Sequence, residues 1–229
     1  MKGTGFKPFE IEDVASSGDG KTKVFTFKQG MDYKPGNFAM AWVPRVSANP
    51  LAIVRGDKLM LAVKLNYKGK KEESFTWNMI QKKKGEHVFV DGPLGKGSFY
   101  EYCDDRKPIV LVGGGIGIAP LASVLPFVYR ENVRKVFLGF GSCDEMVLMD
   151  MFDDLDTYVS TDDGTYGRRG LVTDFLDDAE TLRDSRVFIC GPEAMMKTAA
   201  EKAMRYTDPK DIVLSVERYM KCKRNMRQL

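Results

Sequence analysis

Cysteine is scarce in this chain of 229 residues, and its placement excludes two classes of protein. The four cysteines lie far apart, with neither the density of a disulfide-stapled secreted domain nor the spacing of a metal site. They are Cys103, Cys143, Cys190 and Cys222. Residues 1–10 also lack the apolar segment of a secretory signal. We therefore predict reduced thiols in a cytoplasmic protein.

A large excess of charge of one sign is also absent. The formal net charge is +3, with 43% hydrophobic and 29% charged residues. This composition is ordinary for a globular protein, excludes a disordered one and gives no indication of nucleic acid binding. The length exceeds the usual size of one domain, so we expect two modest domains.

One uncharged stretch, residues 108–129, is long enough to cross a bilayer. Its three consecutive glycines, together with Pro120 and Pro126, would leave backbone groups that lipid cannot satisfy. The apolar pattern also changes at the glycines, from a continuous run to helical spacing. The stretch therefore predicts a strand, a glycine turn and a helix reaching Arg130, and no membrane span.

The first part of the chain, residues 1–102, has the pattern of short strands separated by turn residues. We expect strands at residues 22–27, 38–43, 59–65 and 87–91, with a helical or irregular excursion at residues 72–84. Such a pattern is typical of an antiparallel barrel or sandwich. We place the domain boundary near Tyr102.

From residue 103 to 229 strands alternate with helices. Strands are expected at residues 109–112, 135–140, 157–160, 186–190 and 212–216. The first helix should bury Ile118, Leu121, Ala122, Leu125 and Tyr129, and a later one, with Pro192 in its first turn, should carry Met195, Met196, Ala199, Ala200 and Ala203. This alternation predicts a parallel α/β sheet whose ligands bind at the carboxyl ends of its strands.

The strongest local motif follows the first of these strands. Glycines at this place let the chain turn tightly into a helix and leave backbone N–H groups open to a pyrophosphate. The candidate nucleotide-binding residues are Gly113, Gly114, Gly115, Ile116, Gly117, Ile118, Ala119 and Pro120. A third glycine of the common dinucleotide fingerprint would fall at Ile118, which disfavours an ordinary Rossmann dehydrogenase. The alternative is a tight turn that binds nothing.

Three further segments fall at the ends of expected strands. They contribute Gly141 and Ser142 after the second strand, Thr161 and Asp162 after the third, and Cys190, Gly191, Pro192, Glu193 and Met195 after the fourth. Each places small or polar residues at one rim of the sheet. The alternatives are a plain turn at residues 162–164 and a small buried hydrophobe at Cys190.

The order GGGIGIAPL, STDDGTYGRRGLVTD and CGPEAMM resembles the ferredoxin reductase superfamily, and specifically the electron-transfer subunit of the dihydroorotate dehydrogenase B type. In the N-terminal half, PGNF at residues 35–38 and GPLGKG at residues 92–97 are similar to further motifs of that family. Residues 215–222 resemble the lead-in to its iron–sulfur loop. The match covers most of the chain.

The resemblance implies an N-terminal flavin-binding β-barrel, a C-terminal NAD-binding α/β domain and hydride transfer from NADH to FAD. It also implies a partner, a catalytic subunit or another acceptor protein, that receives the electrons. The chemistry belongs to the cofactors, so no acid or base is required. The lone histidine, His87, is accordingly expected in a barrel strand.

The resemblance places the flavin at Asn49, Pro50, Leu51 and Ala52, with Lys64, Ser74 and Thr76 as further candidates. The family has an arginine where this chain has Asn49, and a serine where it has Ala52. Asparagine cannot neutralise a pyrophosphate as arginine does, and alanine offers no hydroxyl. Flavin affinity or reactivity is therefore expected to be lower than in the family.

Only Cys222 remains of the four cysteines that the family places around a two-iron cluster. One thiolate cannot hold such a cluster, so we expect no iron–sulfur cluster in this chain as given. The basic residues 223–229 are expected to be a solvated terminus, with a docking site as the alternative.

Three functions remain open: an NADH-oxidising electron-transfer subunit, a stand-alone flavin or ferredoxin reductase, and a nucleotide-binding regulatory subunit without flavin turnover. Thr161 stands where relatives that use NADPH carry an arginine for the 2′-phosphate. Asp162 and its neighbouring carboxylates would repel that phosphate, so we predict a preference for NADH. Arg168 and Arg169 favour the opposite preference if their loop folds back.

Overall fold

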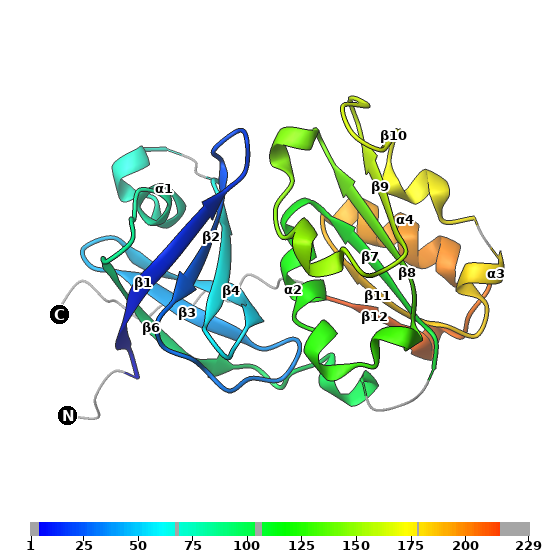
Figure 1. The fold of residues 1–229 in the computed structure, drawn as a ribbon, viewed down its shortest axis with the longest axis horizontal. Coiled ribbons are helices and arrows are strands. Elements are labelled where there is room, and N and C mark those ends of the chain that lie inside the picture. Colours follow the sequence, from blue (N-terminus) through cyan, green and yellow to red (C-terminus); the bar gives the residue numbers. More distant parts are fainter. Residues whose placement is uncertain (1–4, 67–68, 104–106, 178, 216–229) are drawn as a thin grey trace.

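A computed structural model describes residues 5–66, 69–103, 107–177 and 179–215 (Figure 1). The chain forms two lobes, a closed six-stranded antiparallel barrel followed by a six-stranded parallel sheet with helices. The expected fold class is therefore confirmed. The division of the chain into residues 1–102 and 103–229 remains our proposal, with the barrel strands ending at Leu94 and the sheet beginning at Ile109.

The barrel follows the strand order β1, β2, β5, β4, β3, β6. Its strands are β1 (Lys7–Ser16), β2 (Thr22–Phe27), β3 (Phe38–Val43), β4 (Ser47–Arg55), β5 (Met60–Lys64) and β6 (His87–Leu94). Four of them match expected strands, and His87 begins β6 as predicted. The sequence did not indicate β1 and β4, because neither shows regular alternation of buried and exposed residues.

The excursion between β5 and β6 contains the 3-10 turn η1 (Lys71–Glu73) and helix α1 (Phe75–Ile80). Ser74 caps α1, because its hydroxyl accepts a hydrogen bond of 3.4 Å from the backbone N–H of Trp77. Phe75, Met79 and Ile80 are buried, and α1 packs against β3, β4 and β5. The helix therefore covers part of the barrel beside β4 and β5.

The sheet has the strand order β10, β9, β8, β7, β11, β12, and all its strands are parallel. Its strands are β7 (Ile109–Gly114), β8 (Val133–Phe140), β9 (Thr157–Thr161), β10 (Arg168–Arg169), β11 (Arg186–Cys190) and β12 (Ile212–Leu214). All six residues of β7 are buried, as expected for a central strand covered on both faces. The last expected strand was to reach residue 216, which lies outside the described residues.

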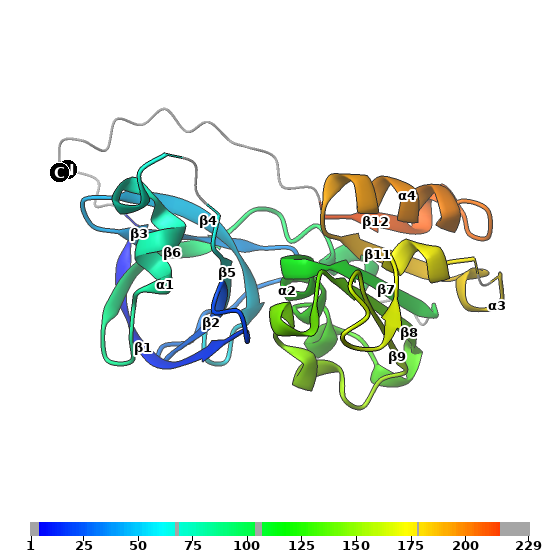
Figure 2. The same ribbon diagram turned by 90° about the horizontal axis from the view of Figure 1, so that it is seen from above.

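Helix α4 (Glu193–Ala203) covers one face of the sheet, and α2 (Ile118–Ala122) lies on the side that faces the barrel (Figure 2). Helix α3 (Ala179–Leu182) precedes β11. Pro192 occupies the N-cap of α4, one position before the first turn in which it was expected. Buried Met196, Ala199 and Ala203 form the inner stripe of α4, close to the prediction.

The expected helix through Tyr129 is wrong. Helix α2 ends at Ala122, the 3-10 turn η4 (Leu125–Phe127) follows, and Tyr129 is 59% exposed instead of buried. Pro126 contributes to the break, because proline has no N–H to donate to the carbonyl oxygen of Ala122 and so cannot continue the α-helix. None of the helices in the described part of the chain has the length and apolar character needed to cross a membrane.

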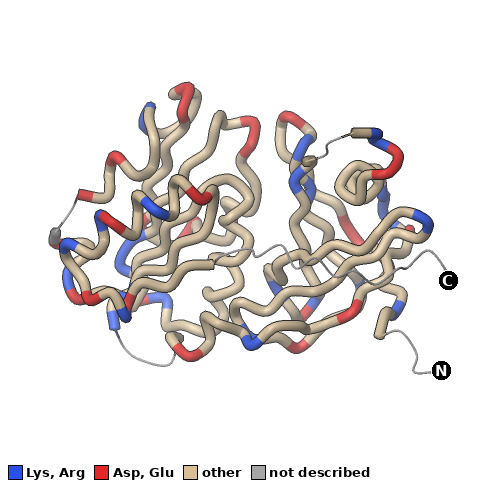
Figure 3. The backbone as a smooth tube through the Cα atoms, turned by 180° about the vertical axis from the view of Figure 1, so that it is seen from behind, with Lys and Arg blue, Asp and Glu red and all other residues tan. Residues whose placement is uncertain are grey.

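The two lobes share a core. Val24, Val54 and Ala62 of the barrel belong to the same buried cluster as Leu111 and Leu121 of the sheet domain, and α2 packs against β4. Lysine and arginine are interspersed with aspartate and glutamate over both lobes (Figure 3).

A tyrosine of the barrel strengthens this junction. The hydroxyl of Tyr33 donates a hydrogen bond of 3.1 Å to the carbonyl oxygen of Ser123, just beyond α2. Its ring meets that of Phe127 edge to face at 5.2 Å. Burial raises the pKa of Tyr33 well above its ordinary value, which keeps the donor protonated.

Candidate functional site at the strand ends

The segments predicted to bind a nucleotide do meet at one edge of the parallel sheet. Parallel pairing brings the carboxyl ends of four strands level, so that the segments expected to bind a nucleotide lie side by side. The paired residues are Gly113 with Cys190, Gly114 with Gly139, Gly139 with Ser160, and Phe140 with Thr161. The sheet therefore places all four segments at one edge.

The order in which the chain adds strands to the sheet reverses at β7. Counted along the sheet, β8 and β9 follow β7 on one side, whereas β11 and β12 lie on its other side. Ligands of open α/β sheets bind outside the carboxyl ends of the strands at such a switch point. Here that place is the junction of the glycine turn with the start of α4.

Several glycines at this junction are required by packing. A Cβ on Gly117 would lie 2.3 Å from the carbonyl oxygen of Cys190, and one on Gly114 would lie 2.5 Å from Sδ of Met195. A Cβ on Gly191 would lie 3.0 Å from the backbone nitrogen of Gly114. Side chains would push β7, β11 and α4 apart, so these glycines need no ligand to explain them.

Gly115, unlike these three glycines, is not required by close packing. Its φ of +53° lies in the left-handed region, where a side chain costs energy. The nearest atom to a Cβ at this position, the Nζ of Lys64, would be 3.8 Å away. Gly115 begins the 3-10 turn η3 (Gly115–Gly117), which leads into α2. The turn thus has open space at Gly115 beside a lysine ammonium.

The loops after β8 and β9 are bonded to each other. The backbone N–H of Asp162 donates to the carbonyl oxygen of Phe140 at 3.0 Å, and that of Cys143 donates to the hydroxyl of Thr165 at 2.9 Å. The Asp163 carboxylate accepts from both the hydroxyl and the backbone N–H of Thr165, which lowers the pKa of Asp163. Asp163 therefore shapes the turn.

The side chains of Thr161 and Asp162 have different surroundings. Thr161 is fully buried, and its hydroxyl is bonded to the backbone of Tyr166. Asp162 is exposed, and no hydrogen bond among the described residues uses its carboxylate. Asp162 is thus the group of this pair that is available to a ligand.

The loop after residue 162 does fold back. Its strand β10 pairs with β9, which places Arg168 opposite Ser160 and Arg169 opposite Thr161. Both arginines are exposed. The condition under which they would favour a 2′-phosphate is therefore met.

The stretch expected to hold the flavin is the middle of β4. Asn49, Leu51 and Ala52 are half-buried and Pro50 is exposed, whereas buried and half-buried residues alternate along the neighbouring strand β3. None of the four residues is fully buried, although Leu51 packs against the buried cluster of the barrel. A half-open surface of this kind can accept a flat ligand.

The other flavin candidates lie on adjacent elements. Ser74 and Thr76 hold the start of α1, because their hydroxyls are 3.1 Å apart and that of Thr76 donates to the carbonyl oxygen of Asn66 at 2.6 Å. Lys64 ends β5 and pairs with Glu145 of the 3-10 turn η6 (Cys143–Glu145) at 2.8 Å. The Lys64–Glu145 pair joins the two lobes, and sequence reasoning missed it because the residues are 81 positions apart.

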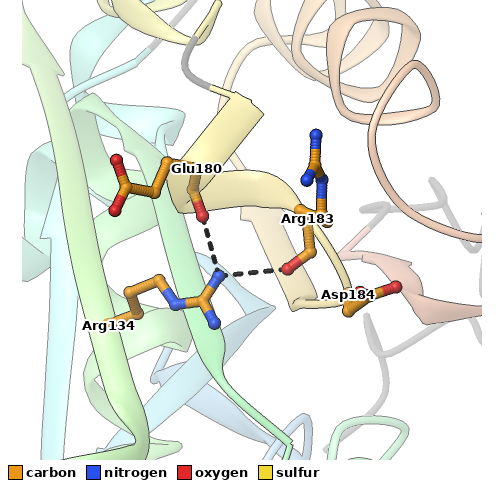
Figure 4. Close-up of a pocket in the computed structure, with 4 residues that line it drawn as sticks. All are labelled: Arg134, Glu180, Arg183 and Asp184. Carbon is orange, nitrogen blue, oxygen red and sulfur yellow. Dashed lines mark hydrogen bonds between the residues drawn. The ribbon is translucent and has the colours of Figure 1, made fainter.

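A cavity at the other end of the sheet has a structural explanation (Figure 4). Its lining residues are Arg134, Glu180, Arg183 and Asp184. Arg134 stands near the amino end of β8, away from the rim, and its Nη1 donates hydrogen bonds of 3.0 Å to the carbonyl oxygens of Glu180 and Arg183. The guanidinium therefore binds the carbonyls at the end of α3.

The PGNF motif has a structural role in the barrel. Asn37 accepts a hydrogen bond from the backbone N–H of Lys34 at 2.7 Å and donates to the carbonyl oxygens of Leu94 and Gly95. One buried side chain thus joins the start of β3 to the GPLGKG segment.

Comparisons with known proteins agree with this geometry. A probable dihydroorotate dehydrogenase B (NAD(+)) electron transfer subunit from Thermococcus kodakarensis is 34% identical over 216 residues, which cover 93% of this chain and 83% of the relative. The chain belongs to the family of dihydroorotate dehydrogenase B electron transfer subunits. Another family member, from Methanocaldococcus jannaschii, is 31% identical and covers 87% of this chain and 74% of its own length. The oxidoreductase NAD-binding domain matches residues 111–201, which include the whole rim.

Solved structures show the same fold. An NADH-dependent reduced ferredoxin-NADP oxidoreductase is 25% identical with a TM-score of 0.74, covering 96% of this chain and 79% of that one. A ferredoxin NADP+ reductase from Neisseria gonorrhoeae, solved with bound FAD and NADP, is 16% identical with a TM-score of 0.71, covering 93% of this chain and 100% of that one. The expected superfamily is therefore confirmed. Cys222 and the basic tail lie outside the described residues.

Proposed function

We propose that this chain is an electron-transfer subunit that oxidises NADH through FAD and passes the electrons to the catalytic subunit of a dihydroorotate dehydrogenase. The observation that carries the proposal is the alignment of four strand ends at the switch point beside β7, next to a barrel whose strand β4 keeps an accessible surface. The names of the relatives support the acceptor.

The residues present fit both cofactors. At the sheet rim, Gly115 has open space beside the Lys64 ammonium, which suits a dinucleotide pyrophosphate. On the barrel, residues 49–52 offer a partly exposed strand surface beside α1. Asn49 and Ala52 supply neither charge nor hydroxyl there, so we assign flavin binding at this stretch to backbone groups and to apolar contact.

When bound, FAD supplies the chemistry, since it accepts a hydride from reduced nicotinamide and passes the electrons on. The contribution of the chain is to orient two rings and exclude water. The buried contacts between α2 and β4 fix the barrel relative to the sheet. No acid or base is needed, which agrees with the absence of histidine from the rim segments.

The decisive experiment is a visible spectrum of the purified full-length chain, followed by anaerobic addition of NADH. We expect a yellow protein with about one FAD per chain whose flavin absorbance bleaches on reduction. Colourless protein that also fails to take up FAD would contradict the proposal and favour the nucleotide-binding regulatory subunit suggested by Asn49 and Ala52. Co-purification with a catalytic subunit distinguishes the proposal from a stand-alone reductase. A cytoplasmic location remains a prediction.

A further inference from the structure

Lys64 and Glu145 form an ion pair that connects the barrel to the sheet domain. The Nζ of Lys64 lies 2.8 Å from Oε2 of Glu145, and the two side chains are 38% and 28% exposed. Water therefore reaches the pair, and its partners can exchange with a solute ion. A fully buried pair would lack this freedom.

The pair spans two glycine turns of the proposed nucleotide site. The Lys64 ammonium is the atom nearest to where a Cβ of Gly115 would be, and Oε1 of Glu145 lies 2.5 Å from where a Cβ of Gly141 would be. A side chain on Gly141 would displace the carboxylate. Both charged groups are thus positioned by turns that the nucleotide is expected to approach.

We propose that Glu145 competes with the dinucleotide pyrophosphate for Lys64. This inference rests on the proposed function and adds two residues that set nucleotide affinity: Lys64 from the barrel, and Glu145 from the same lobe as the glycine turn. An ammonium beside an open backbone turn attracts a pyrophosphate, and the carboxylate is an anion already bonded to that ammonium. Nucleotide binding must therefore break the Lys64–Glu145 contact and replace it with a contact between Lys64 and phosphate.

A purely structural role of the Lys64–Glu145 pair would give a different result on mutation. If the pair only held the lobes together, loss of either partner would leave binding unchanged or weaken it. If Glu145 only repelled anions through space, its removal would help whether or not Lys64 was present. Competition for Lys64 alone predicts that removing Glu145 helps only in a chain that retains Lys64.

The test is isothermal titration of the FAD-supplied full-length chain with ADP-ribose, which carries the pyrophosphate but cannot be oxidised by the flavin. We expect Glu145→Gln to tighten binding about two- to fivefold, within the range for a partly exposed ion pair. Lys64→Met should weaken binding, and the double variant should match Lys64→Met. Asp144→Asn removes an equal charge from the same turn η6 without touching the pair, so it should change affinity less than Glu145→Gln does.

The outcomes separate the two proposals. An unchanged or weakened affinity in Glu145→Gln, or the same gain in the Lys64→Met background, overturns the competition while leaving the nucleotide site in place. If Glu145→Gln binds FAD more tightly but ADP-ribose no more tightly than the wild type does, the competition is also overturned, because Lys64 would then bind the flavin cofactor. Failure of both the wild type and Glu145→Gln to bind ADP-ribose overturns the proposed function and, with it, this inference.

Discussion

Substituting Gly115 and Gly117 separately by alanine should distinguish a glycine needed for nucleotide binding from one needed for packing, although both belong to the turn η3. In Gly117→Ala the new Cβ would lie 2.3 Å from the carbonyl oxygen and 2.6 Å from the carbonyl carbon of Cys190. Both contacts are with backbone, so β11 must shift to relieve them. In Gly115→Ala the new Cβ meets only the tip of Lys64, at 3.8 Å.

The expected magnitudes follow from these contacts. Overpacking against backbone costs about 3 kcal/mol, and each kcal/mol lowers the Tm of a chain this size by about 2–4 °C, so Gly117→Ala should lose about 6–12 °C. The positive φ at Gly115 costs an alanine about 1 kcal/mol, or about 2–4 °C. Alanine keeps the backbone N–H, but its Cβ would occupy the open space at Gly115. If it displaces one bond between a backbone N–H and pyrophosphate, the cost is about 1.5–3 kcal/mol, or about 10- to 150-fold in affinity for NADH.

Thermal unfolding of both variants checks the expected losses of Tm, and NADH titration checks the expected loss of affinity in Gly115→Ala. Gly85→Ala is the matched control, because Gly85 has a φ of +85° and no atom within 4 Å of a new Cβ. It should show the small loss of Tm without loss of NADH affinity. Wild-type affinity in folded Gly115→Ala would refute the assignment of the turn to the nucleotide, and a Gly117→Ala chain as stable as Gly115→Ala would refute the packing argument.

Four further outcomes are expected. Asp211→Asn should destabilise the chain by about 3–5 kcal/mol in urea unfolding, because a buried carboxylate pairs there with Lys107 at 2.6 Å and Arg186 at 2.9 Å; an effect below 1 kcal/mol would contradict this. Burial alone would raise the pKa of Asp211, but those two partners lower it, so its stabilisation is present above about pH 4 and should disappear as the pH falls through the lowered pKa. Iron and acid-labile sulfide analysis should find no cluster, and about two irons per chain would overturn that expectation. NADH should have a higher kcat/KM than NADPH, with Asp162→Ala narrowing the difference by improving NADPH; a wild-type preference for NADPH would instead assign the 2′-phosphate to the arginines of β10.

The rim was predictable because it depends on local patterns. Continuous apolar runs marked β7, β8 and β11, and glycine or polar residues marked where each one ended. Parallel strands must bring those ends to one edge, so the shared rim followed from the fold class, whereas the pairing of Gly113 with Cys190 depends on the strand order that the structure shows. The family motifs then assigned a ligand to that edge.

The barrel was harder to predict because some of its strands lack a pattern. In β1 only Phe9 and Ile11 are buried, and in β4 none of residues 47–52 is fully buried. The failure at β4 is informative, because a strand that leaves its surface open loses the alternation by which strands are recognised. The incomplete burial of residues 49–52 is also what makes β4 a candidate surface for the flavin.

Contacts between distant residues could not be predicted. Lys64 was predicted only as a flavin-binding candidate, and nothing local in the sequence indicates that η6 brings Glu145 to it. The end of α2 was missed for the opposite reason, because an apolar stripe continued through Tyr129 while Pro126 ended the helix. The missing N–H of Pro126 thus had more effect on the structure than the apolar periodicity that continues to Tyr129.

The junction of the lobes determines what this chain can contribute to electron transfer. With no acid or base required, ring distance and orientation are the means by which the protein affects the rate. Barrel residue Val54 shares a buried cluster with Leu121, and the Tyr33 hydroxyl is bonded to Ser123. These contacts set the flavin strand β4 against α2, whose preceding turn is the proposed nucleotide site. Substitutions in this junction should therefore slow flavin reduction more than they weaken the binding of either cofactor, whereas substitutions at Gly115 should act mainly on nucleotide affinity.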